Sequence, residues 1–335
     1  MSETCLIQSF NILIMNHLEC VTSKNNKWYW YLLVLFLSFV ASQTVGSIPL
    51  LFVVIAAMFK NGFDASMFEG LSVNFKAAGI DLNLALACML FIFAVLLIAA
   101  IVFIKLIHGR TWQQVINGTS RVRWSRFFFG FLVWGVISLI LFAISFITEP
   151  EVIRFQFQPE KFFILLVIVL TLIPLQTTAE EFLFRGYMAQ GIASVTKSRW
   201  WILIIPSLLF GLMHAFNPEI KEYGFAVMMP QYIFLGLLLG FMSIMDDGIE
   251  LAMGVHAVNN LLGGLLVTYK GGALQTYALF ELTEINPSKE ILPLFISGIV
   301  IIAIFAAKYK WDFKIINKPV NQPPSVPPIG GGLTV

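Results

Sequence analysis

The sequence predicts an all-α fold, that of a polytopic membrane protein with about eight transmembrane helices. Of its 335 residues, 58% are hydrophobic and only 12% are charged, whereas a soluble domain carries about 25% charged residues. The hydrophobic residues are gathered in runs close to the roughly 20 residues that a spanning helix needs. These runs do not alternate with polar residues, so the pattern excludes a membrane β-barrel.

Eight apolar stretches follow one another along the chain. They lie at residues 29–59, 81–106, 126–148, 161–179, 200–216, 223–245, 250–269 and 291–308. The first is long enough to be tilted, or to be broken near Gly46 and Pro49. The fifth and the seventh are short and contain His, Asn and Gly, so hydropathy alone scores them poorly.

The charges of the loops predict the orientation of these helices. Lys and Arg residues gather at 105–126, at 194–199 and from residue 308 onward, whereas the connections at 149–160 and 217–222 are poorer in them. Cytoplasmic loops carry the excess of basic residues, so both termini are expected in the cytoplasm. The start of the chain lacks the pattern of a cleaved signal peptide; it is expected to lie on the membrane surface or to be disordered.

Five polar or ionisable side chains interrupt or border the apolar stretches and give the strongest indication of function. They are Glu180, Glu181, His214, His256 and Asn260. A charged side chain at the centre of a membrane helix costs roughly 2.5–3.5 kcal/mol on insertion scales. We therefore expect these residues to serve a reaction or a polar ligand inside the membrane.

The fourth apolar stretch runs into the sequence EEFLFR. On a helix, Glu181 and Arg185 are four residues apart and share a face, so they are expected to pair. Glu180 points about 100° away from Glu181. We expect it to face a different neighbour and to lack the arginine, as suits a group that exchanges protons. For Glu181 and Arg185 the alternative is an interfacial charge cluster at the cytoplasmic helix end.

Two further pairs are spaced by four residues, Phe210 with His214 and His256 with Asn260. A single membrane histidine is most often a hydrogen-bonding partner between helices, and Asn259, out of register with His256, is expected to have no special role. Together with the glutamates, these residues fit a hydrolase. A carboxylate and an imidazole deprotonate a water, while a histidine and an asparagine hydrogen-bond the oxyanion of an attacked carbonyl.

Metal binding is the rival use of the same side chains. Glu180, His214 and His256 make an acceptable zinc set, although the zinc-protease spacing HExxH is absent from the sequence. The three cysteines have no metal-ligand spacing and are expected to be structural or incidental. On the residues alone, zinc therefore stays an open alternative to a site without a cofactor.

Three motifs occur in order along these stretches: EExxxR, FxxxH and HxxxN. This order resembles the CAAX protease and bacteriocin-processing (CPBP, or Abi) family, which includes the type II CAAX prenyl endopeptidases. The resemblance covers residues 160–270. It implies eight membrane helices that enclose a polar cavity open to the cytosol.

The resemblance also implies an activity, that of an intramembrane endopeptidase. Glu180 and His214 would activate a water, and His256 and Asn260 would stabilise the oxyanion. The remaining motif residues would shape the site, namely Glu181, Arg185 and Phe210. The implied mechanism depends on glutamate and needs no metal, although members of the family are often labelled metalloproteases.

Five regions follow from the pattern and the resemblance. They are a cytoplasmic N-terminal segment (1–27), N-terminal transmembrane helices (28–159), a CPBP-type protease core (160–270), a last loop and transmembrane helix (271–308) and a Pro/Gly-rich cytoplasmic tail (309–335). The tail holds a PxxP sequence at 324–327, which we expect to be solvated rather than a ligand for a partner.

The expected surroundings are a bacterial plasma membrane, with membrane lipid as one partner. A peptide or protein substrate at the cytoplasmic face is the other, and no nucleic acid is expected; the oligomeric state is left open. The alternative function is that of a non-catalytic membrane immunity or regulatory protein, which binds a peptide or partner in the same cavity. A secondary transporter is disfavoured because no repeat relates the two halves.

Two smaller features complete the predictions. Gly236 and Gly240 form a GxxxG pattern, which favours close helix packing inside the bundle over homodimerisation. The acidic run from Asp246 to Glu250 is expected at the cytoplasmic rim, with its carboxylates facing water.

Overall fold

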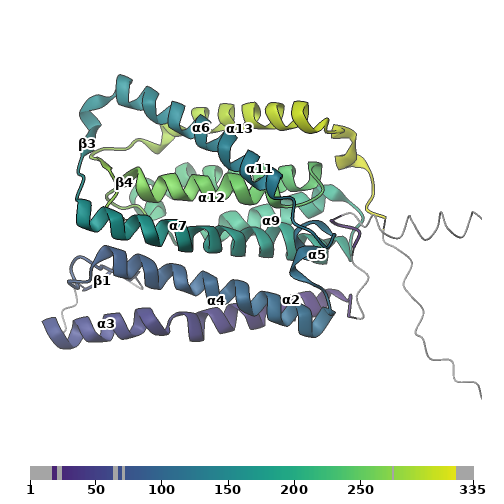
Figure 1. Cartoon of the computed structure of the whole chain (residues 1–335), viewed down its shortest axis with the longest axis horizontal. Helices are drawn as coiled ribbons and strands as arrows, with labels where there is room; N and C mark the ends of the chain where they lie inside the picture. Colours follow the sequence, from purple (N-terminus) through teal and green to yellow (C-terminus); the bar gives the residue numbers. More distant parts are fainter. Residues whose placement is uncertain (1–16, 21–24, 63–66, 70–71, 274, 322–335) are drawn as a thin grey trace, which may run out of the picture.

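The computed structural model describes residues 17–20, 25–62, 67–69, 72–273 and 275–321, and within them the protein is a bundle of long helices (Figure 1). The first apolar stretch is broken where the sequence predicts. Helix α2 (Trp28–Ala41) passes through a π-helical segment, η1 (Ser42–Gly46), into α3 (Ile48–Asn61), which has Pro49 in its first turn. A Cβ on Gly46 would lie 2.9 Å from the Cα atom of Ile92, so glycine permits the contact with the next helix.

The other long helices are α4 (Leu82–His108), α6 (Trp124–Thr148), α7 (Pro159–Glu181), α11 (Phe225–Met245) and α13 (Pro287–Tyr309). Helix α4 begins where the Asp81 carboxylate accepts hydrogen bonds from the backbone N–H groups of Asn83 and Leu84. It ends at Gly109, whose left-handed conformation (φ 69°) is readily adopted only by glycine.

In the described part of the chain, six helices are long and apolar enough to cross a membrane. The protein is therefore an integral, polytopic membrane protein. All eight predicted stretches are helical, but α9 (Arg199–Met213) and α12 (Glu250–Leu265) have only 15 and 16 residues. They are the fifth and seventh stretches, which carry the histidines and the asparagine. The count of eight crossings thus stays a prediction.

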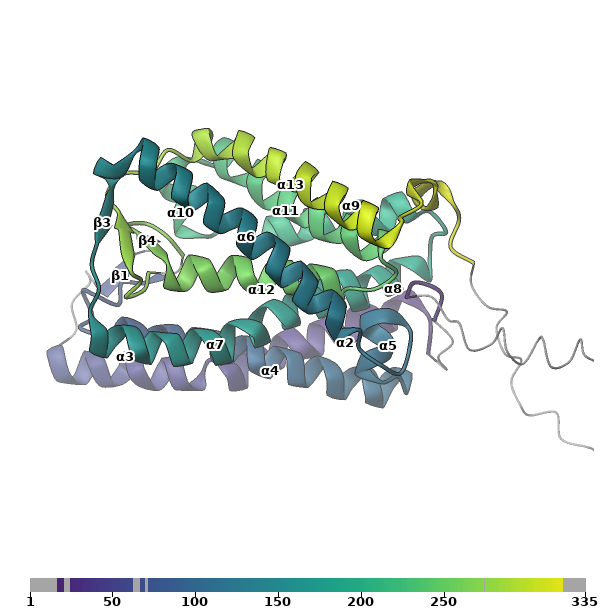
Figure 2. The same cartoon turned by 45° about the horizontal axis from the view of Figure 1, so that its top comes forward.

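The first part of α12 is surrounded by protein rather than by lipid. It lies against α6 and α7 (Figure 2), and residues 250–258 are all buried. A Cβ on Gly254 would lie 2.0 Å from the carbonyl oxygen of Phe127, and one on Gly130 would lie 2.6 Å from that of Leu251. The backbones of α6 and α12 meet at these glycines, and this burial explains why α12 tolerates polar residues that lipid would reject.

The predicted close packing at Gly236 and Gly240 is found inside the bundle. A Cβ on Gly236 would lie 2.7 Å from the carbonyl oxygen of Ser207 in α9, and one on Gly240 would lie 2.9 Å from a methyl carbon of Leu203. Helix α9 therefore covers this face of α11.

Short strands, which the all-α prediction did not include, close the left end of the bundle in Figure 1. A three-stranded sheet has the order β3 (Ile153–Phe155), β5 (Phe280–Leu282), β4 (Val267–Tyr269), with β3 antiparallel and β4 parallel to β5. A two-stranded ribbon joins β1 (Phe68–Glu69) to β2 (Ser72–Val73). Because β4 follows α12 almost directly, the three-stranded sheet fixes the end of that helix.

The short helices complete the connections. They are α5 (Trp112–Asn117), η3 (Pro150–Val152), η4 (Phe182–Met188), α8 (Ala189–Ala193), α10 (Pro218–Tyr223) and η5 (Phe313–Asn317). Helix α5 starts with a capping box, in which the Thr111 side chain accepts from the Gln114 N–H and the Gln114 side chain accepts from the Thr111 N–H.

The acidic run before α12 does not face water, contrary to the prediction. Asp246 is 5% exposed and Glu250 is fully buried. Arg123 Nη2 lies 2.6 Å from Glu250 Oε2, and Arg126 Nη1 lies 2.5 Å from Asp246 Oδ1. Burial raises the pKa of the Asp246 carboxyl to about 6, although the charges of the two arginines oppose the shift. The basic loop that predicted the orientation thus also neutralises these acids.

The N-terminal segment also differs from its prediction, as far as it is described. His17 is 1% exposed, and Leu18 and Cys20 are both 3% exposed. The residues from His17 to Cys20 are therefore packed against the bundle, and are neither disordered nor spread on the membrane surface. Residues 1–16 and the PxxP sequence at 324–327 lie outside the described part.

Candidate active site

The two adjacent glutamates lie where a long helix changes its winding. Helix α7 ends at Glu181 and continues without interruption through the π-helical segment η4 into α8. π-Helical turns inside α-helices are rare and are frequent at functional sites. Here the wider turn carries Arg185, so the EExxxR motif straddles the change.

Glu181 and Arg185 pair as the spacing predicts. Arg185 Nη1 donates to Glu181 Oε1 at 2.9 Å, and the side chains are 1% and 0% exposed respectively. The guanidinium also donates through Nη2 to the carbonyl oxygen of Gly236 at 3.0 Å and lies 4.1 Å from the centre of the Phe210 ring. These contacts connect α7 with α9 and α11 and favour a buried, ionised pair over an interfacial charge cluster.

His256 completes this arrangement from α12. Its Nδ1 lies 2.8 Å from Glu181 Oε1, the same oxygen that accepts from Arg185. A carboxylate that is paired with arginine only accepts hydrogen bonds, so Nδ1 of His256 carries the proton. The other ring nitrogen, Nε2, then faces Glu180 Oε2 at 3.5 Å and Asn260 Nδ2 at 3.4 Å.

The two glutamates therefore meet the same neighbour, contrary to the prediction of separate ones. They diverge around the helix as expected, but the imidazole of His256 is broad enough to present one nitrogen to each. Glu180 Oε2 is buried and forms no hydrogen bond within the described residues, although its side chain is 13% exposed. It is the acid that Arg185 leaves unpaired, and a water or a substrate could complete its hydrogen bonding.

His214 stands at the end of α9 with a fixed ring orientation. Its Nδ1 donates to the carbonyl oxygen of Phe210 at 2.8 Å, which leaves the Nε2 lone pair as the acceptor. The ring stacks on Tyr232, with centres 4.5 Å apart, and its centre lies 4.8 Å from that of Phe210. The Phe210 ring in turn contacts that of His256 at 5.9 Å.

The structure thus links the EExxxR and HxxxN motifs by polar contacts, but not the histidine of the FxxxH motif. Glu180, Glu181, Arg185, His256 and Asn260 are linked by direct polar contacts. Among the residues described, His214 makes no hydrogen bond or ion pair with any of them and reaches the group through the Phe210 ring.

Sequence reasoning missed several polar side chains around Asn260. Asn260 Nδ2 donates to Gln176 Oε1 at 3.0 Å, and Gln176 is 8% exposed. Asn259, for which no special role was expected, donates to Asn260 Oδ1 at 3.1 Å and accepts from the Trp134 indole. Gln176 lies in an apolar stretch four residues before Glu180, so the criterion that selected the glutamates would also have selected it.

A zinc ion does not fit this arrangement. In the described portion, no group of three or more His, Cys, Asp or Glu side chains converges as metal ligands. Of the alternative set, Glu180 Oε2 and His256 Nε2 lie 3.5 Å apart, but His214 makes no polar contact with either of them within the described residues.

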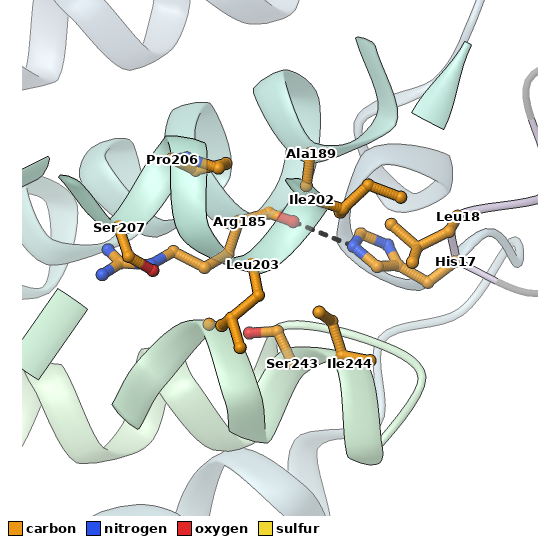
Figure 3. Close-up of a pocket in the computed structure, with 11 residues that line it drawn as sticks. His17, Leu18, Arg185, Ala189, Ile202, Leu203, Pro206, Ser207, Ser243 and Ile244 are labelled. Carbon is orange, nitrogen blue, oxygen red and sulfur yellow. Dashed lines mark hydrogen bonds between the residues drawn. The ribbon is translucent and has the colours of Figure 1, made fainter. Parts of the chain in front are cut away.

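The N-terminal segment contacts the backbone of the π-helical segment η4 (Figure 3). His17 Nε2 donates to the carbonyl oxygen of Arg185 at 2.9 Å, and the backbone N–H of His17 donates to Asp247 Oδ1 at 2.9 Å. The side chains of Ser207 and Ser243 line, with Arg185 and His17, a cavity of about 10 Å³, room for a single water. Arg185 is thus held both through its backbone, by His17, and through its side chain, by Glu181.

Comparison with known proteins supports the predicted resemblance. Residues 159–262 match the family model described as "Type II CAAX prenyl endopeptidase Rce1-like". The resemblance is confirmed. The matched segment begins at the first residue of α7, ends inside α12 and contains every residue of the three motifs. Over 272 residues, 80% of this chain and 88% of the relative, the chain is 27% identical to "Uncharacterized protein YyaK" of Bacillus subtilis (strain 168). No solved structure matches the chain.

The Rce1-like match implies a protease embedded in a membrane. It agrees with the six apolar helices, and both agree with the sequence-based expectation of an integral membrane protein. The relative is uncharacterized, so the substrate, the residues of the reaction and the identity of the membrane are matters for proposal.

Proposed function

We propose that the protein is an intramembrane endopeptidase that hydrolyses a peptide bond with a water activated by Glu180 and His214. One observation carries the proposal. The buried Glu180 Oε2, which has no hydrogen-bonding partner within the described chain, faces an imidazole that a second glutamate holds in place. A base beside a fixed donor is the arrangement that acyl hydrolysis requires.

The steps follow from the atoms on either side. Glu180 takes one proton from the water, and the water oxygen attacks the carbonyl carbon. The Nε2 lone pair of His214 accepts a hydrogen bond from the second O–H group of the water. The resulting oxyanion receives hydrogen bonds from Nε2–H of protonated His256 and from Asn260 Nδ2. When the C–N bond breaks, Glu180 returns its proton to the leaving amine.

Glu181 and Arg185 hold His256 in position. Glu181 Oε1 accepts from Nδ1 at 2.8 Å and orients the ring, as the buried aspartate does in a Ser-His-Asp triad. Arg185 donates to the same carboxylate oxygen at 2.9 Å. The pair therefore orients the donor rather than taking part in bond breaking.

Open space beside Asn260 supports a peptide substrate. His256, Asn260 and Gly263 share one face of α12, since they are spaced by four and three residues. A Cβ on Gly263 would meet nothing within 4 Å, whereas one on Gly254 or Gly264 would meet neighbouring helices. Glycine inside a helix costs about 1 kcal/mol relative to alanine, so a close approach of substrate backbone is a reason to keep it.

The substrate is a peptide or a protein end, presented at the cytoplasmic face of a bacterial plasma membrane that holds both termini on that side. No cofactor and no nucleic acid enter the proposal. The excess of Lys and Arg in the loops at 105–126 and 194–199 supports this orientation, since positive charge stays inside.

The test uses purified protein in detergent and a library of quenched fluorescent peptides. We expect the wild type to cleave, Glu180→Gln and His214→Ala to lose at least about 10²-fold in kcat, and a zinc chelator to change nothing. Glu160→Gln is the matched control, because Glu160 is an exposed carboxylate in the first turn of the same helix. It should cleave like the wild type.

Three outcomes would contradict the proposal. Cleavage that survives Glu180→Gln removes the assigned base. Loss on chelation with recovery on adding zinc moves the same residues into a metal site. Peptide binding that is equal in wild type and Glu180→Gln, without cleavage by either, supports the non-catalytic immunity or regulatory function instead.

A further inference from the structure

A chain of hydrogen bonds crosses three helices and ends at the site. Trp134 Nε1 in α6 donates to Asn259 Oδ1 at 3.1 Å, and Asn259 Nδ2 donates to Asn260 Oδ1 at 3.1 Å. Asn260 Nδ2 then donates to Gln176 Oε1 in α7 at 3.0 Å. No role in catalysis was expected for Trp134, Asn259 or Gln176.

The direction of this chain is fixed at its start. An indole N–H only donates, and Trp134 is 3% exposed, so it cannot turn to water. Asn259 must therefore present its oxygen to Trp134 and its NH₂ group to Asn260. Asn260 must in turn present its oxygen to Asn259, which leaves its NH₂ group on the other side.

That other side is the candidate active site. One N–H of Asn260 is taken by Gln176, and Nδ2 also lies 3.4 Å from Nε2 of His256. The two ends of an asparagine amide have nearly the same shape, so packing alone does not distinguish them. A reversed amide would aim its oxygen at the developing oxyanion and repel it.

We propose that Trp134, Asn259 and Gln176 are positioning residues that hold the Asn260 amide with its nitrogen, and not its oxygen, toward the reacting carbonyl. This inference rests on the proposed function, in which Asn260 is an oxyanion donor. The indole N–H of Trp134 fixes the orientation of the Asn259 amide, and Asn259 in turn fixes that of the Asn260 amide. Gln176 accepts a hydrogen bond from the Asn260 N–H that does not face the substrate. Gln176 lies one turn before Glu180, so the same bond also sets the distance between base and oxyanion donor.

A purely structural reading is that these amides only glue helices together, as polar side chains do in membranes. The two explanations differ in whether the effect of these hydrogen bonds on catalysis depends on the Asn260 side chain. If the chain works by orienting Asn260, its loss should matter only while Asn260 is present. If it holds the helices together, its loss should matter equally without Asn260.

The kinetic test is therefore a cycle of variants in the peptide assay. Asn260→Leu should lower kcat by about 10²–10³-fold, the effect of removing one oxyanion donor. Asn259→Leu should lower kcat by roughly 10–10²-fold with KM within about twofold, because part of the protein then holds the amide reversed. In the Asn260→Leu background, measured under single turnover, Asn259→Leu should add less than about twofold.

Trp134→Phe keeps the aromatic packing and removes only the hydrogen-bond donor. It should lower kcat in the same way as Asn259→Leu, but by a smaller factor. Trp124→Phe is the matched control, because Trp124 lies in the same helix with 54% of its surface exposed. A loss in kcat that is the same with and without Asn260 would overturn the proposal. So would kcat within twofold of wild type in both Asn259→Leu and Trp134→Phe.

A second measurement separates failure of the inference from failure of the proposed function. In protein labelled with ¹⁵N-tryptophan, the indole resonance that disappears in Trp134→Phe belongs to Trp134. It should shift in Asn259→Leu, whether or not the protein cleaves any peptide. If the indole resonance does not shift in Asn259→Leu, the hydrogen-bond chain itself is wrong. If it shifts but the wild type cleaves no peptide, only the proposed function is contradicted.

Discussion

The two adjacent glutamates allow a sharp separation of catalysis from stability. Both are changed to glutamine, one at a time, which keeps the shape and removes the charge. Glu181 accepts from Arg185 and from His256 through the same oxygen, and both members of the Glu181–Arg185 pair are buried. Glu180 has no arginine partner, and its side chain is 13% exposed.

The expected magnitudes follow from these contacts. Glu181→Gln leaves the Arg185 guanidinium as an uncompensated buried charge, a change that costs about 3–5 kcal/mol. At 2–4 °C per kcal/mol, the melting temperature should fall by roughly 6–20 °C. The contacts of Arg185 with Gly236 and with the Phe210 ring remain, so the helix packing survives in part. Glu180→Gln breaks no ion pair with arginine and should change the melting temperature by less than about 3 °C.

The assay is thermal unfolding in detergent, followed by intrinsic tryptophan fluorescence, beside the peptide cleavage assay. Both variants should be inactive, but only Glu181→Gln should be unstable. The double variant Glu181→Gln/Arg185→Met is the control, because it removes the stranded charge; it should regain most of the stability and none of the activity. Equal melting temperatures of the two single variants, or no recovery in the double variant, would refute the reasoning.

Three further predictions concern other parts of the molecule. Burial lowers the pKa of His17 in the folded protein, so as the pH falls the unfolded chain takes up a proton at a higher pH than the folded one. The stability that neutral His17 contributes is therefore present above about pH 6.5 and is lost at lower pH. Faster hydrogen exchange at His17–Cys20 should report this loss, and His17→Phe should abolish the pH dependence. Gly263→Leu should raise KM at least about tenfold without changing the melting temperature, because its Cβ meets only open space. Gly254→Ala should cost about 1–3 kcal/mol of unfolding free energy, because its Cβ would lie 2.0 Å from Phe127 O.

Local patterns predicted what local geometry decides. Residues four apart on one helix face do meet, as in the pair of Glu181 with Arg185 and in that of Phe210 with His214. The break near Gly46 was also predictable, since proline and glycine act on their own helix. The short apolar runs located α9 and α12 although hydropathy alone scores them poorly. They could not show that the first part of α12 is enclosed by protein, because enclosure depends on which helices pack around it.

Contacts between distant segments were beyond the sequence. Nothing in the spacing of Glu180 and Glu181 shows that His256, 75 residues after Glu181, offers one nitrogen to each. The acids from Asp246 to Glu250 were expected in water because their partners, among them Arg123, belong to a loop more than 100 residues earlier. For the same reason the sequence did not single out Trp134, because what distinguishes this residue is its hydrogen bond to Asn259 on α12.

The enclosure of α12 also explains why a membrane protein can hold a polar site at all. Both polar residues of the HxxxN motif have a hydrogen-bonding partner on another helix: Glu181 of α7 for His256, and Gln176 of α7 for Asn260. Removal of a single partner leaves a buried polar group unpaired, which costs about 1–3 kcal/mol. The network is therefore stable only when α6, α7 and α12 are packed together. That packing depends on backbone contact at Gly130 and Gly254, so the position of the candidate catalytic side chains is set by two residues that carry no side chain beyond hydrogen.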